Sequence, residues 1–281
     1  MSIATRILAD EFHTIIDERH PLAALIDATQ ENIAAYYRRF VGLDGVVLHR
    51  DDQVEWFASK PGPPGSHVGR FNTEDDIDAA IDAAIDQVIA DMSAQVRRWD
   101  WAVYRTCRPL DLGERLLRKG GKPGRVPWLL AALNDLSTEA PPDGFSVRIV
   151  DSSAMMADWS RVSAAGFETG LDVCKVYHDA YAQHLPSADN NAVHLIGYHG
   201  DEPVTSSTLL VAGGIAGIYD ISTPPEHRRR GFGSAITVAT LNLARAKGQR
   251  HVCCMASDMG LPIYQRLGFN IHVDIPEYVW E

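Results

Sequence analysis

The sequence is poor in cysteine. Its 281 residues include four cysteines (Cys107, Cys174, Cys253 and Cys254) with no C-x-x-C spacing. Adjacent residues of a strand point to opposite faces, so Cys253 and Cys254 are not expected to share a partner. We therefore predict reduced, buried thiols rather than a disulfide framework or a metal site.

Basic charge is also scarce. Lysine and arginine number 26 against 37 aspartates and glutamates, which gives a formal net charge of −11. Binding to a nucleic-acid backbone needs clustered basic side chains, so we expect no nucleic-acid partner. An acidic surface gives a weak preference for cationic ligands such as amines.

Long hydrophobic runs are absent. No run approaches the roughly 20 apolar residues that a membrane span requires. The first residues, 1–11, carry acidic side chains where a signal peptide would continue its apolar core. We expect no membrane association and a cytoplasmic location.

Two familiar phosphate-binding loops are missing, namely G-x-G-x-x-G and G-x-x-x-x-G-K-[ST]. The chain has instead Arg228-x-x-Gly231-x-Gly233, between an apolar strand and an apolar helix. The unpaired N–H groups of a first helical turn attract phosphate oxygens. The pattern therefore predicts a pyrophosphate site, with a basic turn that only caps the helix as the alternative.

A second motif follows at a defined distance. After the apolar strand 251–256, the chain carries Tyr264-x-x-x-Gly268-Phe269, and the glycine is suited to the end of a short helix. The two motifs are linked in order, with one helix and one strand between them. A pair of this kind is more specific than either motif alone.

Over residues 145–281 the two motifs together resemble the GNAT superfamily of N-acetyltransferases. The resemblance implies an α/β (α+β) fold with a mixed, mostly antiparallel sheet flanked by helices. One pair of strands would splay apart to bind acetyl-CoA, the co-substrate, and no metal would be needed. It also implies an acyltransferase that moves an acetyl group from acetyl-CoA to a primary amine.

The resemblance also implies the site residues. The backbone of Ile221, Ser222 and Thr223 would bond the pantetheine arm and the acetyl carbonyl. Tyr264 would protonate the departing sulfur as general acid, although a core aromatic packed beneath Gly268 is the alternative for that side chain. The pyrophosphate would be held by the backbone of Arg228, Arg229, Arg230, Gly231, Phe232, Gly233 and Ser234.

The general base does not follow from the motifs. Many members of the family carry a glutamate where this chain has Gly217. Asp220, Tyr219 and Glu168 are candidates, as is a base that acts through ordered water. We take Asp220 as the catalytic candidate.

The sequence identifies neither the acceptor amine nor the oligomeric state. A small metabolite, an antibiotic, a peptide N-terminus and a lysine side chain are all compatible with the sequence. The alternative to an enzyme is a non-catalytic acyl-CoA-binding regulatory module.

Length favours two domains, and the composition of residues 137–144 is typical of a linker. We predict a degenerate GNAT-like domain over 1–142 and a catalytic GNAT domain over 143–281. The order helix, strand, short helix, Gly-Gly in the first half repeats the order at 233–269, with Leu116 where Tyr264 stands and no phosphate motif.

Apolar periodicity and turn residues predict the remaining elements. We interpret Asp78, Asp82, Asp86 and Asp91 as the solvent-facing side of a helix. The first half is expected to hold helices over 2–40 broken at His20-Pro21, a hairpin of 46–50 with 54–58, a loop over 61–69, a helix over 73–96, a strand over 99–104, a helix over 109–121 and a strand over 126–133. The second half is expected to hold strands over 145–150, 192–198, 204–212 and 215–222, helices over 153–166 and 172–184, and a closing pair of strands over 269–273 and 277–280.

Overall fold

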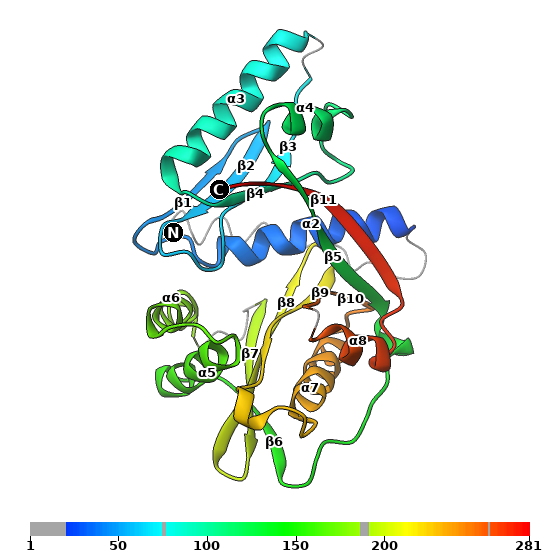
Figure 1. The fold of residues 1–281 in the computed structure, drawn as a ribbon. Helices are drawn as coiled ribbons and strands as arrows, with labels where there is room; N and C mark the ends of the chain where they lie inside the picture. Colours follow the sequence, from blue (N-terminus) through cyan, green and yellow to red (C-terminus); the bar gives the residue numbers. More distant parts are fainter. Residues whose placement is uncertain (1–20, 75–76, 186–190, 258) are drawn as a thin grey trace. The chain divides into compact units, whose positions relative to one another are not determined.

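The structure, a computed structural model, describes residues 21–74, 77–185, 191–257 and 259–281 (Figure 1). The first of the two expected helices, over residues 2–20, lies outside the described residues. By compactness the chain divides into two units. Unit 1 comprises Met1–Arg39 and Trp128–Val273, and unit 2 comprises Phe40–Pro127 and Asp274–Glu281.

Unit 1 is an α/β structure. Its elements in chain order are α2 (Leu22–Arg38), the end of β5 (Lys122–Ala132), the 3-10 turn η1 (Leu133–Asp135), β6 (Phe145–Ile149), α5 (Ser153–Gly166), α6 (Leu171–Ala182), β7 (Ala192–His199), β8 (Glu202–Ala212), β9 (Ile215–Ser222), the 3-10 turn η2 (Pro225–His227), α7 (Phe232–Ala246), β10 (His251–Met255), α8 (Leu261–Leu267) and the start of β11 (Ile271–Trp280).

The sheet of unit 1 runs in the order β5-β10-β9-β8-β7-β6. Neighbouring strands are antiparallel except β9 and β10, which are parallel. Helices α5 and α6 lie on one side of the strands and α7 lies on the other (Figure 1). This is the mixed, mostly antiparallel sheet flanked by helices that the resemblance implied.

The buried core of unit 1 forms between the sheet and α7. Ile236, Leu241 and Ala244 recur at helical spacing on α7 and are fully buried. They pack with Ile218 of β9 and Cys254 of β10 in one apolar cluster. Burial of this stripe stabilises α7 and fixes its first turn against the strands.

Unit 2 is a smaller α/β structure. Its elements are β1 (Val46–Arg50), β2 (Val54–Ser59), β3 (His67–Phe71), α3 (Asp78–Gln95), β4 (Trp99–Ala102), α4 (Leu112–Arg118), the start of β5 and the end of β11. Its sheet runs β1-β2-β3-β4-β11, and only β3 and β4 are parallel neighbours. The rings of Trp99 and Trp280 stack face to face in its core, with centroids 4.3 Å apart.

The two halves of the sequence repeat one topology. In each, three antiparallel strands lead to a helix, a parallel strand, a short helix and a last strand. The strand after α4 is β5, whose end pairs with β10 in unit 1. The strand after α8 is β11, whose end pairs with β4 in unit 2. Each unit is thus completed by the last strand of the other repeat.

This exchange explains why the compact units differ from the boundary expected between residues 142 and 143. Trp128–Ala132 joins unit 1 because it pairs with β10. Helix α2 joins unit 1 because it packs on β8 and β9. That residues 1–142 are a degenerate copy stays a prediction.

Two local expectations were wrong. Residues 67–71, assigned mostly to a loop, form β3, because pairing of Trp56 with Val68 outweighs the local effect of Gly69. The expected closing pair is one strand, β11, which continues through Pro276. Proline cannot donate a backbone hydrogen bond, but the carbonyl of Pro276 accepts one from the Val103 amide at 2.8 Å.

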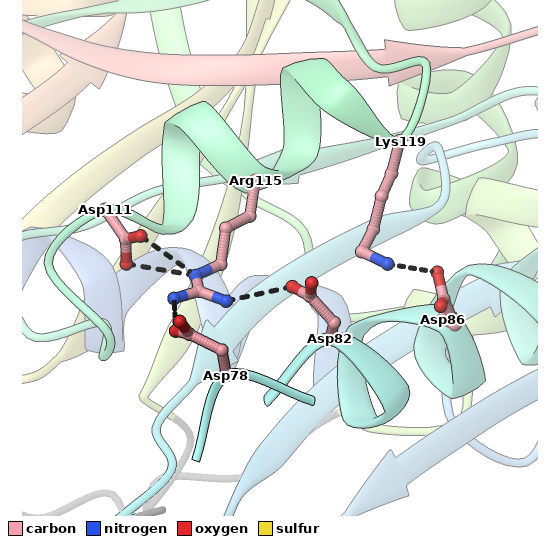
Figure 2. A network of polar contacts seen from close by, with 6 residues as sticks. All are labelled: Asp78, Asp82, Asp86, Asp111, Arg115 and Lys119. Atoms are coloured by element: carbon pink, nitrogen blue, oxygen red, sulfur yellow. Dashed lines mark hydrogen bonds and ion pairs between the residues drawn. The ribbon is translucent and has the colours of Figure 1, made fainter. Parts of the chain in front are cut away.

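The acidic row of α3 does more than face solvent (Figure 2). The guanidinium of Arg115 on α4 donates to Asp82 at 2.9 Å, to Asp78 at 2.5 Å and to Asp111 at 3.0 Å. One turn further along both helices, the Lys119 ammonium contacts Asp86 at 2.7 Å. The carboxylates are exposed, as expected, and they also align α4 on α3.

Candidate functional site

A glycine turn leads the chain from β9 into α7. Gly231 precedes the helix with φ of +85°, a left-handed conformation that a residue with a Cβ adopts only at a cost. The first N–H groups of α7 have no acceptor within the helix. They lie at the positive end of the helix dipole, so the turn is suited to phosphate oxygens.

Gly233 leaves the surface of this first turn bare. A Cβ added there would lie 3.5 Å from the Thr223 Oγ1 atom and 3.7 Å from the Ile263 Cδ1 atom, which are ordinary contacts. The packing of the protein itself therefore does not require glycine. Close approach of a ligand to the N–H groups does account for it, so the residues present fit a pyrophosphate.

Strands β9 and β10 separate next to this turn. Their register pairs Ala216 with Val252 and Gly217 with Cys253, and no pair further along is formed in the part of the chain that the structure describes. The carbonyl of Ser222 accepts from the Thr205 hydroxyl of β8 at 2.7 Å.

The three arginines of the turn have different surroundings. Arg228 donates to the carbonyls of Thr223 at 3.0 Å and Gly166 at 2.8 Å, and pairs with Glu168 at 2.9 Å. Its side chain therefore ties the end of α5 to the end of β9. Arg229 and Arg230 are exposed, and the Arg230 guanidinium lies 4.8 Å from the centroid of the Phe232 ring.

Helix α8 is held against the same turn. The Arg266 guanidinium of α8 donates to the Ser234 hydroxyl of α7 at 2.5 Å and contacts Glu139 at 3.3 Å. Together with the position of Ile263 near Gly233, this contact brings the two sequence motifs into one place.

Tyr264 lies on α8 and is 7% exposed. Its ring packs edge-on against Phe269, with centroids 5.4 Å apart, and belongs to the apolar cluster beneath α7. Burial raises the pKa of the Tyr264 hydroxyl well above its usual range. The hydroxyl is therefore protonated at neutral pH, as a proton donor must be.

Asp220 occupies a β-bulge. Ser206 pairs with Ser222 and Thr208 with Tyr219, so Asp220 and Ile221 together oppose the single residue between Ser206 and Thr208. Asp220 has φ of +53°. The bulge turns the Asp220 side chain to the face shared by α2 and α6, next to the side chain of Tyr219 rather than opposite it.

Two tyrosines hold the Asp220 carboxylate. The Tyr36 hydroxyl of α2 donates to Asp220 Oδ1 at 2.9 Å, and the Tyr181 hydroxyl of α6 donates to Oδ2 at 2.9 Å. Burial raises the pKa of the Tyr177 hydroxyl, and the nearby Asp220 carboxylate raises it further. Burial raises the pKa of Asp220 in spite of hydrogen bonds from Thr208 and the two tyrosines, which lower it.

At residue 217, where many family members carry a glutamate, this protein has no room for a side chain. A Cβ at Gly217 would lie 2.0 Å from the Asn32 Oδ1 atom of α2. Asn32 donates to the carbonyl of Ala212 at 2.9 Å and accepts from the Tyr219 hydroxyl at 2.7 Å. Asn32 therefore fills the space that a side chain at residue 217 would occupy.

The other two base candidates are engaged elsewhere. Tyr219 donates its hydroxyl proton to Asn32. Glu168, with φ of +56°, pairs with Arg228 at 2.9 Å. Of the three side chains considered from sequence, Asp220 alone is a buried carboxylate with a raised pKa.

Sequence reasoning missed four residues of this region. Asn32 and Tyr36 lie on α2, far from both motifs in sequence, and nothing in their local pattern marks them. Tyr177 and Tyr181 are four residues apart, and that spacing alone places both on one face of α6. The structure does not bring Asp220 into contact with Tyr264, because α2 and α6 cover the former and α7 packs over the latter.

Among the described residues, no group of three or more His, Cys, Asp or Glu side chains could hold a metal ion. The four cysteines are free; Cys107, Cys253 and Cys254 are buried, as predicted, whereas Cys174, also predicted to be buried, is partly exposed. None of the described helices has the length and apolar composition of a membrane span.

Comparison with known proteins places the two motifs in a family. Residues 207–272 match the family model of the GNAT acetyltransferase domain. The glucosamine 6-phosphate N-acetyltransferase of Trypanosoma brucei brucei is 34% identical over 55 residues. That alignment covers 20% of this chain and 37% of the trypanosome enzyme. The matches confirm the predicted resemblance in the second half of the chain.

Solved structures share the fold at low sequence identity. A GCN5-related N-acetyltransferase from Kribbella flavida is 16% identical, with a TM-score of 0.62 over 99% of this chain and 96% of its own. A tandem GNAT protein from the clavulanic acid biosynthesis pathway is 11% identical, with a TM-score of 0.59 over 95% of this chain and 97% of its own. A GCN5-related N-acetyltransferase from Sphaerobacter thermophilus is 12% identical, with a TM-score of 0.59 over 91% of this chain and 90% of its own.

Proposed function

We propose that this chain, whose second half contains a GNAT acetyltransferase domain, moves an acetyl group from acetyl-CoA to a primary amine in the cytoplasm. One observation carries the proposal. The left-handed Gly231 and the bare Gly233 open the first turn of α7 beside the point where β9 and β10 part. A pyrophosphate at the turn and a pantetheine arm along Ile221, Ser222 and Thr223 would fit this arrangement.

In this proposal the backbone N–H groups from Arg228 through Ser234 hold the pyrophosphate. Arg229 and Arg230, which are exposed, add positive charge near it. Arg228 contributes through its backbone, because its guanidinium is occupied by two carbonyls and Glu168.

The amine attacks the acetyl carbonyl, a C–N bond forms and the C–S bond breaks. Asp220 receives the proton that the amine loses, and Tyr264 gives its proton to the departing sulfur. Exchange with solvent then restores both groups. The raised pKa values of Asp220 and Tyr264 support these roles.

The alternative is a regulatory module that binds acyl-CoA without turnover. The specific observation in its favour is Gly217, which stands where many family members have a catalytic glutamate and which Asn32 closes to a side chain. Such a module would bind acetyl-CoA and release no thiol with any amine.

Thiol release from acetyl-CoA in the presence of amines tests the proposal. The panel spans alkyl amines, lysine derivatives, peptide N-termini and aminosugars, with glucosamine 6-phosphate included because the similar trypanosome enzyme is named for it. We expect amine-dependent release above the rate of spontaneous hydrolysis.

Tyr264→Phe removes one oxygen and separates rate from affinity. Positioned proton transfer contributes roughly 10²- to 10⁴-fold, so kcat should fall by about that factor. The affinity for acetyl-CoA should be unchanged, because the turn at the start of α7 is untouched. Wild-type turnover in Tyr264→Phe, where chemistry limits the rate, would make Tyr264 a packing residue.

A further inference from the structure

We propose that Thr205 of β8 is a positioning residue for acetyl-CoA. Its hydroxyl holds the peptide between Ser222 and Thr223 in the orientation that offers the Thr223 N–H to the pantetheine arm. The inference rests on the proposed function, because it explains how the end of β9 is prepared for the co-substrate. All of these residues belong to unit 1.

Hydroxyl groups of β8 hold the carbonyls at the end of β9. The pairing of the two strands ends at Ser206 with Ser222, just beyond the bulge at Asp220. The Thr205 hydroxyl donates to the carbonyl of Ser222 at 2.7 Å, and the Ser206 hydroxyl donates to the carbonyl of Asp220 at 3.0 Å. Side chains therefore fix this backbone where the regular strand pairing is interrupted and ends.

The Ser222 carbonyl sets the direction of the next N–H group. The carbonyl oxygen and the amide hydrogen of a trans peptide lie on opposite sides of the C–N bond. Because the Ser222 oxygen is held toward Thr205 on β8, the Thr223 N–H points away from β8. The described residues offer this N–H no backbone acceptor, and the pairing of β9 with β10 has ended at Gly217. Thr223 is partly exposed, so its N–H is a donor available to a ligand.

Thr223 is held by further contacts. Its carbonyl accepts from the Arg228 guanidinium at 3.0 Å. Its hydroxyl lies 3.0 Å from that of Thr205 and must donate there, because the single Thr205 proton goes to Ser222. A Cβ at Gly166 would lie 2.8 Å from the Thr223 nitrogen, so the end of α5 packs directly against this segment. A donor held in place before binding loses little conformational freedom when the ligand arrives.

The place of Thr223 indicates which part of the co-substrate it meets. A Cβ at Gly233 would lie 3.5 Å from the Thr223 Oγ1 atom, so Thr223 lies beside the first turn of α7. That turn is the proposed pyrophosphate site. In CoA, pantetheine is attached to the pyrophosphate and carries amide carbonyls, which accept hydrogen bonds from N–H groups. The Thr223 N–H thus donates to a pantetheine carbonyl when acetyl-CoA is bound.

Thr205→Val and Thr205→Ser form the discriminating pair. Valine replaces the hydroxyl by a methyl group and keeps the methyl group beside Gly197, where a Cβ would lie 2.6 Å from the Thr205 Cγ2 atom. Serine keeps the hydroxyl and loses that methyl group. Thr205→Val should weaken the binding of acetyl-CoA about five- to tenfold, because the peptide is no longer held with its N–H toward the ligand. Thr205→Ser should bind acetyl-CoA within about twofold of wild type.

A shorter ligand gives a readout that a general loss of structure would not. Calorimetry is repeated with 3′-phospho-ADP, the part of CoA that has the pyrophosphate and lacks pantetheine. Thr205→Val should bind it within about twofold of wild type, because the N–H groups at the start of α7 are unchanged. A damaged fold would weaken the binding of both ligands alike.

Ser207→Ala is the matched control. Ser207 is also buried on β8, and its hydroxyl contacts that of Thr240 on α7 at 2.7 Å rather than the end of β9. Loss of this hydroxyl should lower the thermal unfolding temperature and leave the affinities for both ligands unchanged. Thermal unfolding of every variant verifies that it is folded.

The wild type offers a test that needs no variant of Thr205. In NMR spectra of protein labelled with ¹⁵N-threonine, the Thr223 amide is identified by its absence in Thr223→Val. Its proton resonance should move downfield with acetyl-CoA and change little with 3′-phospho-ADP, because only acetyl-CoA brings a pantetheine carbonyl to this N–H. If Thr205→Val does not fold, these spectra decide.

The outcomes separate this inference from the proposed function. An equal loss for both ligands in a folded Thr205→Val, or no loss, overturns the inference, and so does a Thr223 amide proton that acetyl-CoA leaves unmoved. A loss for acetyl-CoA alone in Thr205→Val, with Thr205→Ser and Ser207→Ala like wild type, supports it. Failure of every amine of the panel to release thiol overturns the transfer reaction and leaves that support standing. A wild type that binds neither ligand overturns both proposals.

Discussion

The hydroxyl of Tyr219 donates to the side-chain oxygen of Asn32 at 2.7 Å, and this oxygen stands 2.0 Å from where a Cβ of Gly217 would be. The side chain of Asn32 on α2 therefore occupies the space where a side chain at residue 217 of β9 would lie. A glutamate at residue 217 would clash with the side chains of Asn32 and Tyr219.

Gly217→Ala should therefore destabilise the protein. Inserting a methyl group into a packed interior costs about 1–3 kcal/mol, and the clash here is with a hydrogen-bonded amide. The free energy of unfolding, measured in denaturant, should fall by about that amount. Gly233→Ala is the control, because a Cβ at Gly233 makes ordinary contacts.

A double-mutant cycle localises the cause of that loss. In an Asn32→Ala background the clashing oxygen is gone, so Gly217→Ala should cost less than in the wild type. An equal cost in both backgrounds would place the strain elsewhere.

The buried histidines predict acid sensitivity. Burial, with Arg39 nearby, lowers the pKa of His194 to about 3 and that of His184 to about 4. Both values lie below the 6.5 of an unfolded histidine, so the unfolded state binds more protons as the pH falls. Stability should be full above pH 6.5 and decline toward pH 4, by about 2–4 kcal/mol for His194.

Denaturant unfolding at pH 7 and pH 4.5 measures this decline. His194→Gln should flatten the profile, and His272→Asn, on an exposed part of β11, should leave it unchanged. Asp220, whose raised pKa acts in the opposite sense at low pH, offsets part of the decline. A wild-type stability that is level from pH 7 to pH 4.5 would contradict the account of His194.

Arg229 and Arg228 should have different roles, one in binding CoA and the other in holding α5 to β9. Arg229 is exposed, so Arg229→Ala should weaken CoA binding about two- to fivefold at low salt and less at high salt.

Arg228→Ala breaks bonds to Thr223 and Gly166 and should raise amide hydrogen exchange near residues 163–169. Unchanged exchange there would show that Arg228 does not hold α5 to β9.

Local pattern predicted most of unit 1, because its motifs and strand alternation depend on neighbouring residues. Strands β7, β8 and β9, helix α7 and the glycine turn before α7 lie where the sequence placed them. Pairing between residues far apart in the sequence could not be predicted from local pattern. The exchange of β5 and β11 between the repeats, and the docking of α2 on β9, join residues more than a hundred positions apart.

The site was predicted in the same uneven way. Asp220 was chosen as the catalytic candidate from its place on the strand. Regular alternation would put its side chain on the same face of the sheet as that of Ile218. The bulge opposite β8 directs it instead to Tyr36 and Tyr181. A bulge depends on the partner strand, which single-strand periodicity does not contain. The bond of the Arg228 side chain to α5 could not be predicted, because its carbonyl partner there, Gly166, is 62 residues away.

The most direct test of the central claim is calorimetric titration of the full chain with acetyl-CoA, beside Gly233→Glu and Gly233→Ala. Wild type should bind one acetyl-CoA per chain, because the glycine turn before α7 is the sole such turn in the described residues. Gly233→Glu should remain folded and lose binding, since its side chain would occupy the pyrophosphate position, while Gly233→Ala should remain folded and bind acetyl-CoA more weakly, because its methyl group would hinder the approach to the N–H groups. No binding by the wild type, two sites per chain, or binding retained in Gly233→Glu would contradict the account.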